Sequence, residues 1–384
     1  MTDGPRAVRA NEMDALRRLT DIVFRPLMPE QYPQLFNAEN LDNLRVTFDG
    51  DVCTSHVGMT QRDALIMGCA IRVCCIGSVA THPDYREQGL ASACFLDSVD
   101  KAHADGVDVM IVSGGRGLYT RNGCLHLGHD TKFNATAEQL TATFSNSASV
   151  TIGPLSTGDL NLVAECYRKE PVRFVRTPKD YGFVMQSGWA MNAPAEFVIV
   201  RSASALGDEN NPGEFLGYVV VRNPEEGKSV SITEFAGDRH AVLAALPQIT
   251  GRYRLTGLNW QVMGTDNVMK TLCQAFSFES TATSASGTLK LINFPQLMRR
   301  MSRRFEEIIG AEAASDLRFE REGEQYLFGI GMENLVLDRD TATRAVFGDL
   351  GVLPAEIGEH PGRLGEMLRA ILPIPTLWYG LNYA

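Results

Sequence analysis

The segment VATHPDYREQGLAS, residues 79–92, holds residue types that could bind a phosphate. An apolar run ends at its start, and Gly89 and Ala91 follow a charged stretch. A helix that begins at about Gln88 would present unpaired backbone N–H groups and the positive end of its dipole, which favours phosphate. Gly89 has no Cβ to hold a ligand away from the backbone, and Arg86 adds positive charge beside it. The spacing Arg86-x-x-Gly89-x-Ala91 therefore predicts a site for a pyrophosphate.

The elements around this segment are predicted to be a buried strand, a helix and a second buried strand. Gly68 divides the preceding apolar stretch into two strands, of which the second should be central and buried on both faces. After Pro83, apolar residues recur at helical spacing until Gly106, which ends the helix. The run VDVMIVSG, residues 107–114, is the next strand, and LYTRNGC, residues 118–124, is a short helical turn.

The rest of the chain also alternates between helix and strand patterns. Residues 11–24 have apolar residues at helical spacing, and Asp49-Gly50-Asp51 marks a hairpin. From about residue 150 a second series of strands and helices follows, without a residue-level repeat. The last part opens with an amphipathic helix over residues 292–310, whose arginines we interpret as a solvated face rather than a phosphate site.

Composition and charge narrow the possible functions. At 384 residues we expect about two or three domains, and 44% hydrophobic with 21% charged residues is typical of a soluble protein. The formal net charge of -10 argues against a nucleic-acid binder with a general basic surface. We find neither a signal-peptide pattern nor an apolar stretch long enough to span a membrane, so we expect a cytoplasmic protein. Eight cysteines without a CxxC pair indicate reduced, buried thiols.

The segment 79–92 resembles the acetyl-CoA signature Q/R-x-x-G-x-G/A of the GNAT superfamily of N-acetyltransferases. Its first part is similar to that superfamily's V-x-P-x-x-R approach. In LYTRNGC, Tyr119 and Gly123 are in register with the superfamily's Y-x-x-x-G-F element, while Cys124 replaces the aromatic residue. The resemblance implies acetyl-CoA as co-substrate and no metal; the alternative is a strand-turn-helix crossover without a ligand. The residues it assigns to acetyl-CoA are Val79, Ala80, Thr81, Arg86, Glu87, Gln88, Gly89, Leu90, Ala91 and Ser92.

Over essentially the whole chain, the sequence resembles the Eis (enhanced intracellular survival) family. That family joins two GNAT halves to a sterol-carrier-protein-like C-terminal domain, and GTLKLINFPQLMRRM, GEQYLFGI and RDTATRAVFGD carry the resemblance in the last part. The implied fold is α/β (α+β), with a catalytic GNAT half over 1–150, a degenerate GNAT-like half over 151–285 and an α+β sterol-carrier-protein-like domain over 286–384. In the second half, SITEFAGDRHAVL lacks the R-x-x-G-x-A spacing, so we expect it to bind no CoA. The family is often hexameric, which implies a homo-oligomer.

The implied reaction is direct, sequential transfer of an acetyl group to a primary amine, without a covalent enzyme intermediate. The developing oxyanion needs N–H donors, which the family pattern places on the strand from Val79 to Thr81. The leaving thiolate needs a proton donor. Superfamily practice assigns that role to Tyr119, whereas in Eis-like enzymes the acid is a tyrosine that falls on Cys124 here. We prefer Tyr119; Cys124 is either a weak donor or a buried packing residue.

The end of the chain carries a further implied role. In Eis-like enzymes the terminal carboxylate reaches the active site and helps to deprotonate the amine, which assigns this role to Ala384. A terminus is usually frayed. The apolar closing sequence LWYGLNYA, residues 377–384, instead favours a docked tail.

Several alternatives stay open at this point. The protein could bind CoA or another small molecule without catalysis, because Cys124 departs from the family pattern, and the C-terminal domain could carry a lipid. Cys124, His126 and His129 have a loosely metal-like spacing without a fourth ligand, so we expect no metal site. We interpret His56 and His82 as surface or satisfied residues rather than bases. The amine could belong to a small molecule or a peptide, and we expect neither nucleic acid nor membrane as partner.

Overall fold

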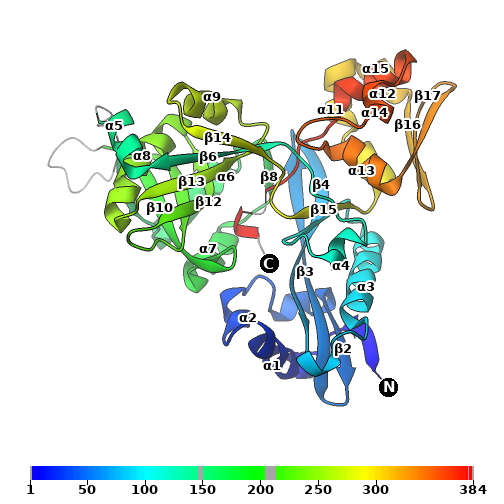
Figure 1. Ribbon diagram of the computed structural model, residues 1–384, viewed down its shortest axis with the longest axis horizontal. Coiled ribbons are helices and arrows are strands. Elements are labelled where there is room, and N and C mark those ends of the chain that lie inside the picture. The colour runs from blue at the N-terminus through cyan, green and yellow to red at the C-terminus, as the bar shows by residue number, and fades with distance from the viewer. Residues whose placement is uncertain (1, 146–149, 204–212, 379, 383–384) are drawn as a thin grey trace. The chain divides into compact units, whose positions relative to one another are not determined.

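The computed structural model describes residues 2–145, 150–203, 213–378 and 380–382 (Figure 1). The described chain divides into two structural units. The first unit combines the residues up to Gly128 with Ser284–Asn382, and the second unit is His129–Thr283. Each unit contains a mixed sheet flanked by helices, so the predicted α/β class is confirmed. Among the helices of the described ranges, none combines the length and the hydropathy that a membrane span needs.

The first unit is built on a sheet with the strand order β1-β2-β3-β4-β5-β15. Only β4 and β5 run parallel along this path; the other neighbours are antiparallel. Figure 1 shows α1 and α2 on one side of this sheet and α3 on the other. The elements are β1 (Asp3–Ala7), α1 (Met13–Val23), α2 (Met28–Gln31), β2 (Leu44–Asp49), β3 (Val52–Ile66), β4 (Cys69–Thr81), α3 (Leu90–Ala104), β5 (Val109–Val112), α4 (Gly117–Thr120) and β15 (Thr288–Leu291).

Two tight turns set the register of the central strands. β2 and β3 are joined at Gly50-Asp51, where the sequence predicted a hairpin. β3 and β4 are joined at Met67-Gly68, both with positive φ (50° and 84°), which is the conformation of a two-residue hairpin turn whose twist matches the strands. The prediction that Gly68 divides the apolar stretch into two strands is therefore confirmed, and the middle of β4 is buried as expected.

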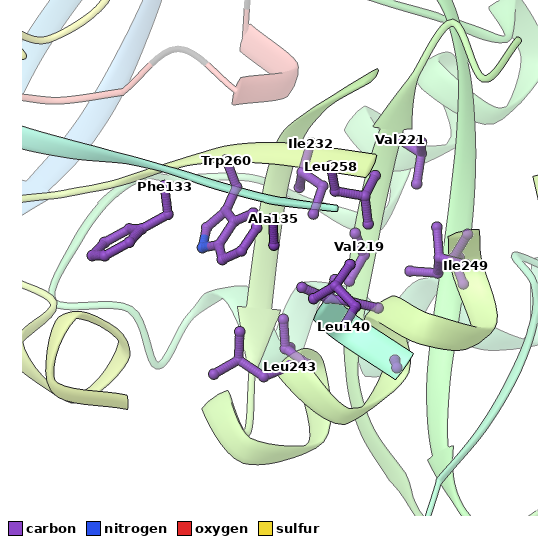
Figure 2. Close-up of a cluster of buried hydrophobic side chains, with 14 of the residues drawn as sticks. Phe133, Ala135, Leu140, Val219, Val221, Ile232, Leu243, Ile249, Leu258 and Trp260 are labelled. Carbon is purple, nitrogen blue, oxygen red and sulfur yellow. The ribbon is translucent and has the colours of Figure 1, made fainter. Parts of the chain in front are cut away.

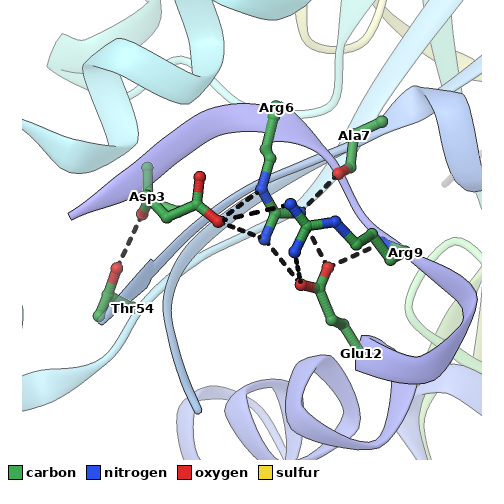
Figure 3. Close-up of polar contacts among 7 residues, drawn as sticks. Asp3, Arg6, Ala7, Arg9, Glu12 and Thr54 are labelled. Carbon is green, nitrogen blue, oxygen red and sulfur yellow. Dashed lines mark hydrogen bonds and ion pairs between the residues drawn. The ribbon is translucent and has the colours of Figure 1, made fainter. Parts of the chain in front are cut away.

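A network around Arg6 fixes β1 to the residues that begin α1 (Figure 3). The Arg6 guanidinium donates to both carboxylate oxygens of Glu12, at 2.8 and 2.7 Å, and to Asp3 at 2.9 Å. Arg9 also donates to Glu12, at 3.0 Å. The bond from Arg6 lowers the pKa of Glu12, so this carboxylate stays ionised at neutral pH and keeps the N-terminal strand in place.

The C-terminal part of the first unit adds helices and a three-stranded sheet in the order β16-β17-β18. The single helix predicted over 292–310 is two helices that meet at Met301, a fully buried residue where packing rather than propensity decides the backbone. The elements are α10 (Phe294–Arg300), α11 (Ser302–Ile309), α12 (Ala311–Ser315), β16 (Leu317–Glu322), β17 (Gln325–Ile330), β18 (Glu333–Asp338), α13 (Arg339–Phe347), α14 (Ala355–Gly358) and α15 (Gly362–Ile371).

A buried carboxylate ties this part to the beginning of β5. Asp108 is fully buried and accepts hydrogen bonds from the backbone N–H of Arg72 at 2.7 Å, from Gln296 at 3.0 Å and from Arg300 at 2.7 Å. Gln296 and Arg300 both belong to α10. The carboxylate thus joins β4, β5 and α10 within the first unit.

The second unit has a sheet with the order β14-β6-β13-β12-β11-β10-β7, and β9 pairs with β10. β12 and β13 are its parallel pair, and α8 connects them. The elements are β6 (Asp130–Thr136), α5 (Ala137–Thr143), β7 (Val150–Pro154), α6 (Leu160–Tyr167), β8 (Val172–Phe174), α7 (Pro178–Ser187), β9 (Trp189–Ala190), β10 (Ala193–Ser202), β11 (Phe215–Arg222), β12 (Ser229–Gly237), α8 (Arg239–Tyr253), β13 (Gly257–Val262), α9 (Asn267–Ala275) and β14 (Glu279–Thr283).

The core of the second unit lies between this sheet and the helices α5 and α8 (Figure 2). Leu243 and Ile249 of α8 and Leu140 of α5 pack against side chains of the strands. The rings of Phe133 and Trp260, on neighbouring strands, stack with centroids 6.0 Å apart. The second unit therefore has a hydrophobic core of its own.

Candidate active site

The last residues of β4 lie beyond the end of the strand beside it. β4 pairs with β5 only as far as Ile76, which lies opposite Val112. β5 ends at Val112, whereas β4 continues to Thr81. Along residues 77–81, β5 therefore leaves one edge of β4 uncovered. Backbone groups on such an edge can form strand-like hydrogen bonds with an extended ligand.

A β-bulge lies within this part of β4. Gly58 of β3 pairs with Gly77, but His56 pairs with Ala80, so Ser78 and Val79 share one position opposite β3. Ser78 has a φ of 51°, which is uncommon for a residue with a Cβ. Bulges re-aim backbone groups and are frequent beside active sites. Gly77, an isolated glycine within a strand pattern, is the sequence signal that could have located this bulge.

The turn between β4 and α3 fits a pyrophosphate. Gly89 has a φ of 77° and precedes α3, and no side chain of the described residues caps the N-terminus of this helix. A Cβ placed on Gly89 would meet no atom of the described residues within 4 Å, its chain neighbours aside, so a ligand can approach the backbone of this turn closely. Arg86 is exposed beside it. The uncapped helix end and the exposed cation are the features that bind phosphate groups.

The predicted cofactor residues lie in one continuous passage. Val79, Ala80 and Thr81 end β4, and the turn and the first turn of α3 hold the rest, Arg86, Glu87, Gln88, Gly89, Leu90, Ala91 and Ser92. The residues from Arg86 to Gly89 are exposed, and those from Leu90 to Ser92 are half-buried. The passage thus offers an uncovered strand edge followed by an uncapped helix end.

The two candidate acids lie in and after α4, and both are buried. Tyr119 is 7% exposed, and its ring centroid lies 5.6 Å from that of Phe95. Cys124 is fully buried in the same hydrophobic cluster, against which Val79 of the bulge also packs. The structure therefore gathers Val79, Tyr119 and Cys124 around one cluster. Burial raises the pKa of the Cys124 thiol to about 12, which makes it a weaker acid than an ordinary cysteine.

The prediction for Ala384 lies outside the described residues. The residues just before it, Gly380–Asn382, form a short 3₁₀ turn and are buried.

His56 differs from its sequence interpretation. It is fully buried, and its Nδ1 lies 2.8 Å from the carbonyl oxygen of Ser78, but its Nε2 has no hydrogen-bond partner among the described residues. His82 agrees better with the interpretation, because its Nδ1 accepts a hydrogen bond from the N–H of Asp84 at 3.3 Å. The described part of the chain contains no cluster of three or more His, Cys, Asp or Glu side chains that could hold a metal ion.

The corresponding passage of the second unit, from β12 to α8, has a different chemistry. The carboxylate of Asp238 caps α8 by accepting a hydrogen bond from the N–H of Ala241 at 2.8 Å. Arg239 is held by ion pairs with Glu170 and with Asp266. A helix end that already carries a carboxylate repels phosphate. The expectation that the second unit binds no CoA stays a prediction.

Residues 5–126 match the family model described as the acetyltransferase (GNAT) domain. The matched range contains the uncovered end of β4, the uncapped start of α3, and α4. The chain therefore carries a GNAT acetyltransferase domain, and the protein is an acetyltransferase.

Solved structures share the fold over nearly the whole chain. A conserved protein of Enterococcus faecalis V583, described as a probable N-acyltransferase, has a TM-score of 0.65 at 14% identity and covers 98% of both chains. A GCN5-related N-acetyltransferase from Kribbella flavida (TM-score 0.63, 12% identity) and Eis1 from Mycobacterium abscessus (TM-score 0.62, 10% identity) cover 100% of both chains. At these identities the likeness establishes the fold alone. The sequence matches no curated protein.

Proposed function

We propose that the protein transfers an acetyl group from acetyl-CoA to a primary amine by direct, sequential transfer. The observation that carries this proposal is the uncapped start of α3, which follows the uncovered end of β4 after the connecting residues 82–89. This pairing offers helix-end N–H groups to a pyrophosphate and a strand edge to an extended arm. The GNAT domain match over residues 5–126 supports it independently.

Each part of the passage has a separate task in this proposal. The first-turn amides of α3 and the exposed Arg86 hold the pyrophosphate, because both favour negative charge. The edge of β4 orients the pantetheine arm, and backbone N–H groups between Val79 and Thr81 stabilise negative charge on the acyl oxygen. Bound acetyl-CoA supplies the activated thioester carbonyl.

Two groups of the chain handle protons in this proposal. Tyr119 holds the proton for the departing thiolate on its phenolic oxygen, and Cys124 is the weaker alternative. The carboxylate of Ala384 positions the substrate ammonium and stabilises it on the way to deprotonation. The burial of Gly380–Asn382 supports a docked tail.

The proposal extends to the organisation of the chain. We include in it the Eis-like arrangement, with GNAT-like halves over 1–150 and 151–285, a sterol-carrier-protein-like domain over 286–384, and homo-oligomeric assembly. The full-length fold likeness to Eis1 supports the arrangement of the chain.

The test of cofactor binding is calorimetry with acetyl-CoA. We expect saturable binding that weakens roughly tenfold in R86A, the loss of one charge-assisted contact. R303A is the matched control, because Arg303 is an exposed arginine on α11, and it should bind as the wild type does. No saturable binding of acetyl-CoA by the wild type would refute the proposal.

The test of transfer is thiol release with a panel of amines that includes aminoglycosides, polyamines and lysine peptides. Y119F should lose about 10²-fold or more in kcat if Tyr119 is the acid, while C124S should stay near the wild type. If C124S loses kcat and Y119F stays near the wild type, Cys124 is the acid instead. Binding of acetyl-CoA without transfer to any amine would favour a binding protein without catalysis.

A further inference from the structure

The imidazole of His56 is placed against the β-bulge of the active-site strand. Its Nδ1 lies 2.8 Å from the carbonyl oxygen of Ser78, the bulge residue with positive φ. A carbonyl oxygen only accepts hydrogen bonds, so Nδ1 must carry the proton and donate it. The ring is fully buried, and burial lowers its pKa to about 4, so it is neutral at pH 7 and Nε2 holds a lone pair.

The bond to Ser78 also determines where the next N–H points. The carbonyl of Ser78 and the N–H of Val79 belong to one planar peptide unit, in which a trans bond makes them point in opposite directions. Because the carbonyl is held toward His56, the N–H of Val79 is directed away from His56. The neighbouring residue acts in the same way, since the hydroxyl of Ser55 donates to the carbonyl of Ala80 at 2.9 Å.

These two contacts make β3 the support of the bulge. The carbonyl groups on both sides of Val79 are held by the consecutive side chains of Ser55 and His56. Without the imidazole, the Ser78–Val79 peptide could rotate, because the positive φ of Ser78 is strained by about 1–2 kcal/mol relative to an ordinary conformation. The buried Nε2, which has no hydrogen-bond partner among the described residues, destabilises the folded state. A histidine at this position is therefore explained best by the hydrogen bond that its Nδ1 donates to Ser78.

We propose that His56 is a positioning residue for acyl transfer, which fixes the N–H of Val79 in the direction in which it meets the acyl oxygen. This inference rests on the proposed acetyl transfer. His56 touches neither substrate nor cofactor in it and acts only through the bulge backbone.

The decisive comparison is between H56L and H56N. Asparagine places an amide N–H close to the position of Nδ1 and can still donate to Ser78, whereas leucine fills space without a donor. We expect kcat to fall about 10²-fold in H56L, the effect of losing one oxyanion donor, and to stay within about fivefold in H56N. The dissociation constant for CoA should change less than about threefold in both, because the pyrophosphate contacts lie elsewhere. Equal kcat values in the two variants would overturn the inference.

A measurement without substrate separates this inference from the proposed function. Amide hydrogen exchange of residues 76–82 in the free protein should be at least about tenfold faster in H56L than in H56N. If wild-type protein fails to transfer acetyl groups, the proposed function fails, but the exchange result still decides whether His56 holds the bulge. If H56L does not fold, H56Q replaces it, because glutamine carries its amide one carbon farther from its own backbone and so no longer places an N–H at the position of Nδ1. Equal exchange in H56Q and H56N then refutes the support role.

Discussion

Acidification should destabilise the first unit through His56. Burial lowers the pKa of this imidazole from 6.5 to about 4, and the bond to Ser78 only partly opposes that shift. The unfolded chain takes up a proton on His56 near pH 6.5, whereas the folded protein keeps the ring neutral down to about pH 4. The unfolded state therefore binds more protons in this window, and stability that is fully present above pH 6.5 is lost as the pH falls through it.

The magnitude follows from the two pKa values. From 6.5 to about 4, at about 1.4 kcal/mol per pKa unit, the full loss in unfolding free energy is roughly 3–4 kcal/mol. About 2 kcal/mol of this is already lost at pH 5. A loss of this size is a large part of the stability of an ordinary domain.

The assay is native-state hydrogen exchange in urea, followed on peptides from β3 and β4 at pH 7.5 and pH 5. H56N removes the titrating ring but keeps a donor to Ser78, so its unfolding free energy should fall by about 2 kcal/mol less than that of the wild type between these pH values. H103N is the matched control, because His103 is an exposed histidine on α3, and it should follow the wild type. The reasoning fails if H56N and the wild type lose the same free energy.

Three further substitutions test the contacts that hold each unit together. D108A should lower the unfolding free energy of the first unit by about 3 kcal/mol, because Arg300 and two N–H donors lose a buried acceptor. Urea denaturation measures this loss, and a loss of less than about 1 kcal/mol would contradict the prediction. R176M should lower the unfolding free energy of the second unit by about 3–5 kcal/mol, because Glu234 stays buried without its bidentate arginine. Thermal melts of R176M and R176M/E234Q test this reason. A higher melting temperature in the double variant would confirm it, and an equal or lower one would refute it. D338A removes the cap that Asp338 places on the N–H of Thr341, at 2.9 Å, and should cost about 1 kcal/mol, with T341V as a comparison that keeps the backbone bond.

Local patterns in the sequence predicted much of the fold around the site. The turn at Gly68, the helix after Gly89 and the strand after Gly106 all follow from glycine positions and apolar spacing, which are properties of a few neighbouring residues. The helix was predicted to begin at about Gln88, two residues before Leu90, where α3 begins. Tertiary packing explains what was missed, as at Met301, where a fully buried side chain divides a continuous amphipathic pattern into two helices.

The role of His56 could not be predicted from local patterns. Its meaning depends on the carbonyl of Ser78, which lies 22 residues away in sequence and turns toward it only because of the bulge. A histidine in an apolar strand pattern gives no sign of such a partner. The pairing of β15 with β5 is equally non-local, since the sequence of residues 288–291 does not identify the strand with which they pair.

The pairing of β15 with β5 has a consequence for how the protein is made. β15 covers the outer edge of β5, and α10 supplies two of the donors to Asp108, yet both are synthesised only after the whole second unit has been synthesised. At a translation rate of about 5–20 residues per second, the outer edge of β5 stays unpaired for roughly ten to forty seconds before β15 is made. Unpaired edges recruit other strands, so the nascent chain is exposed to aggregation in this interval. A gene truncated before residue 284 should therefore yield an acetyltransferase domain that chaperones retain rather than a freely folding fragment.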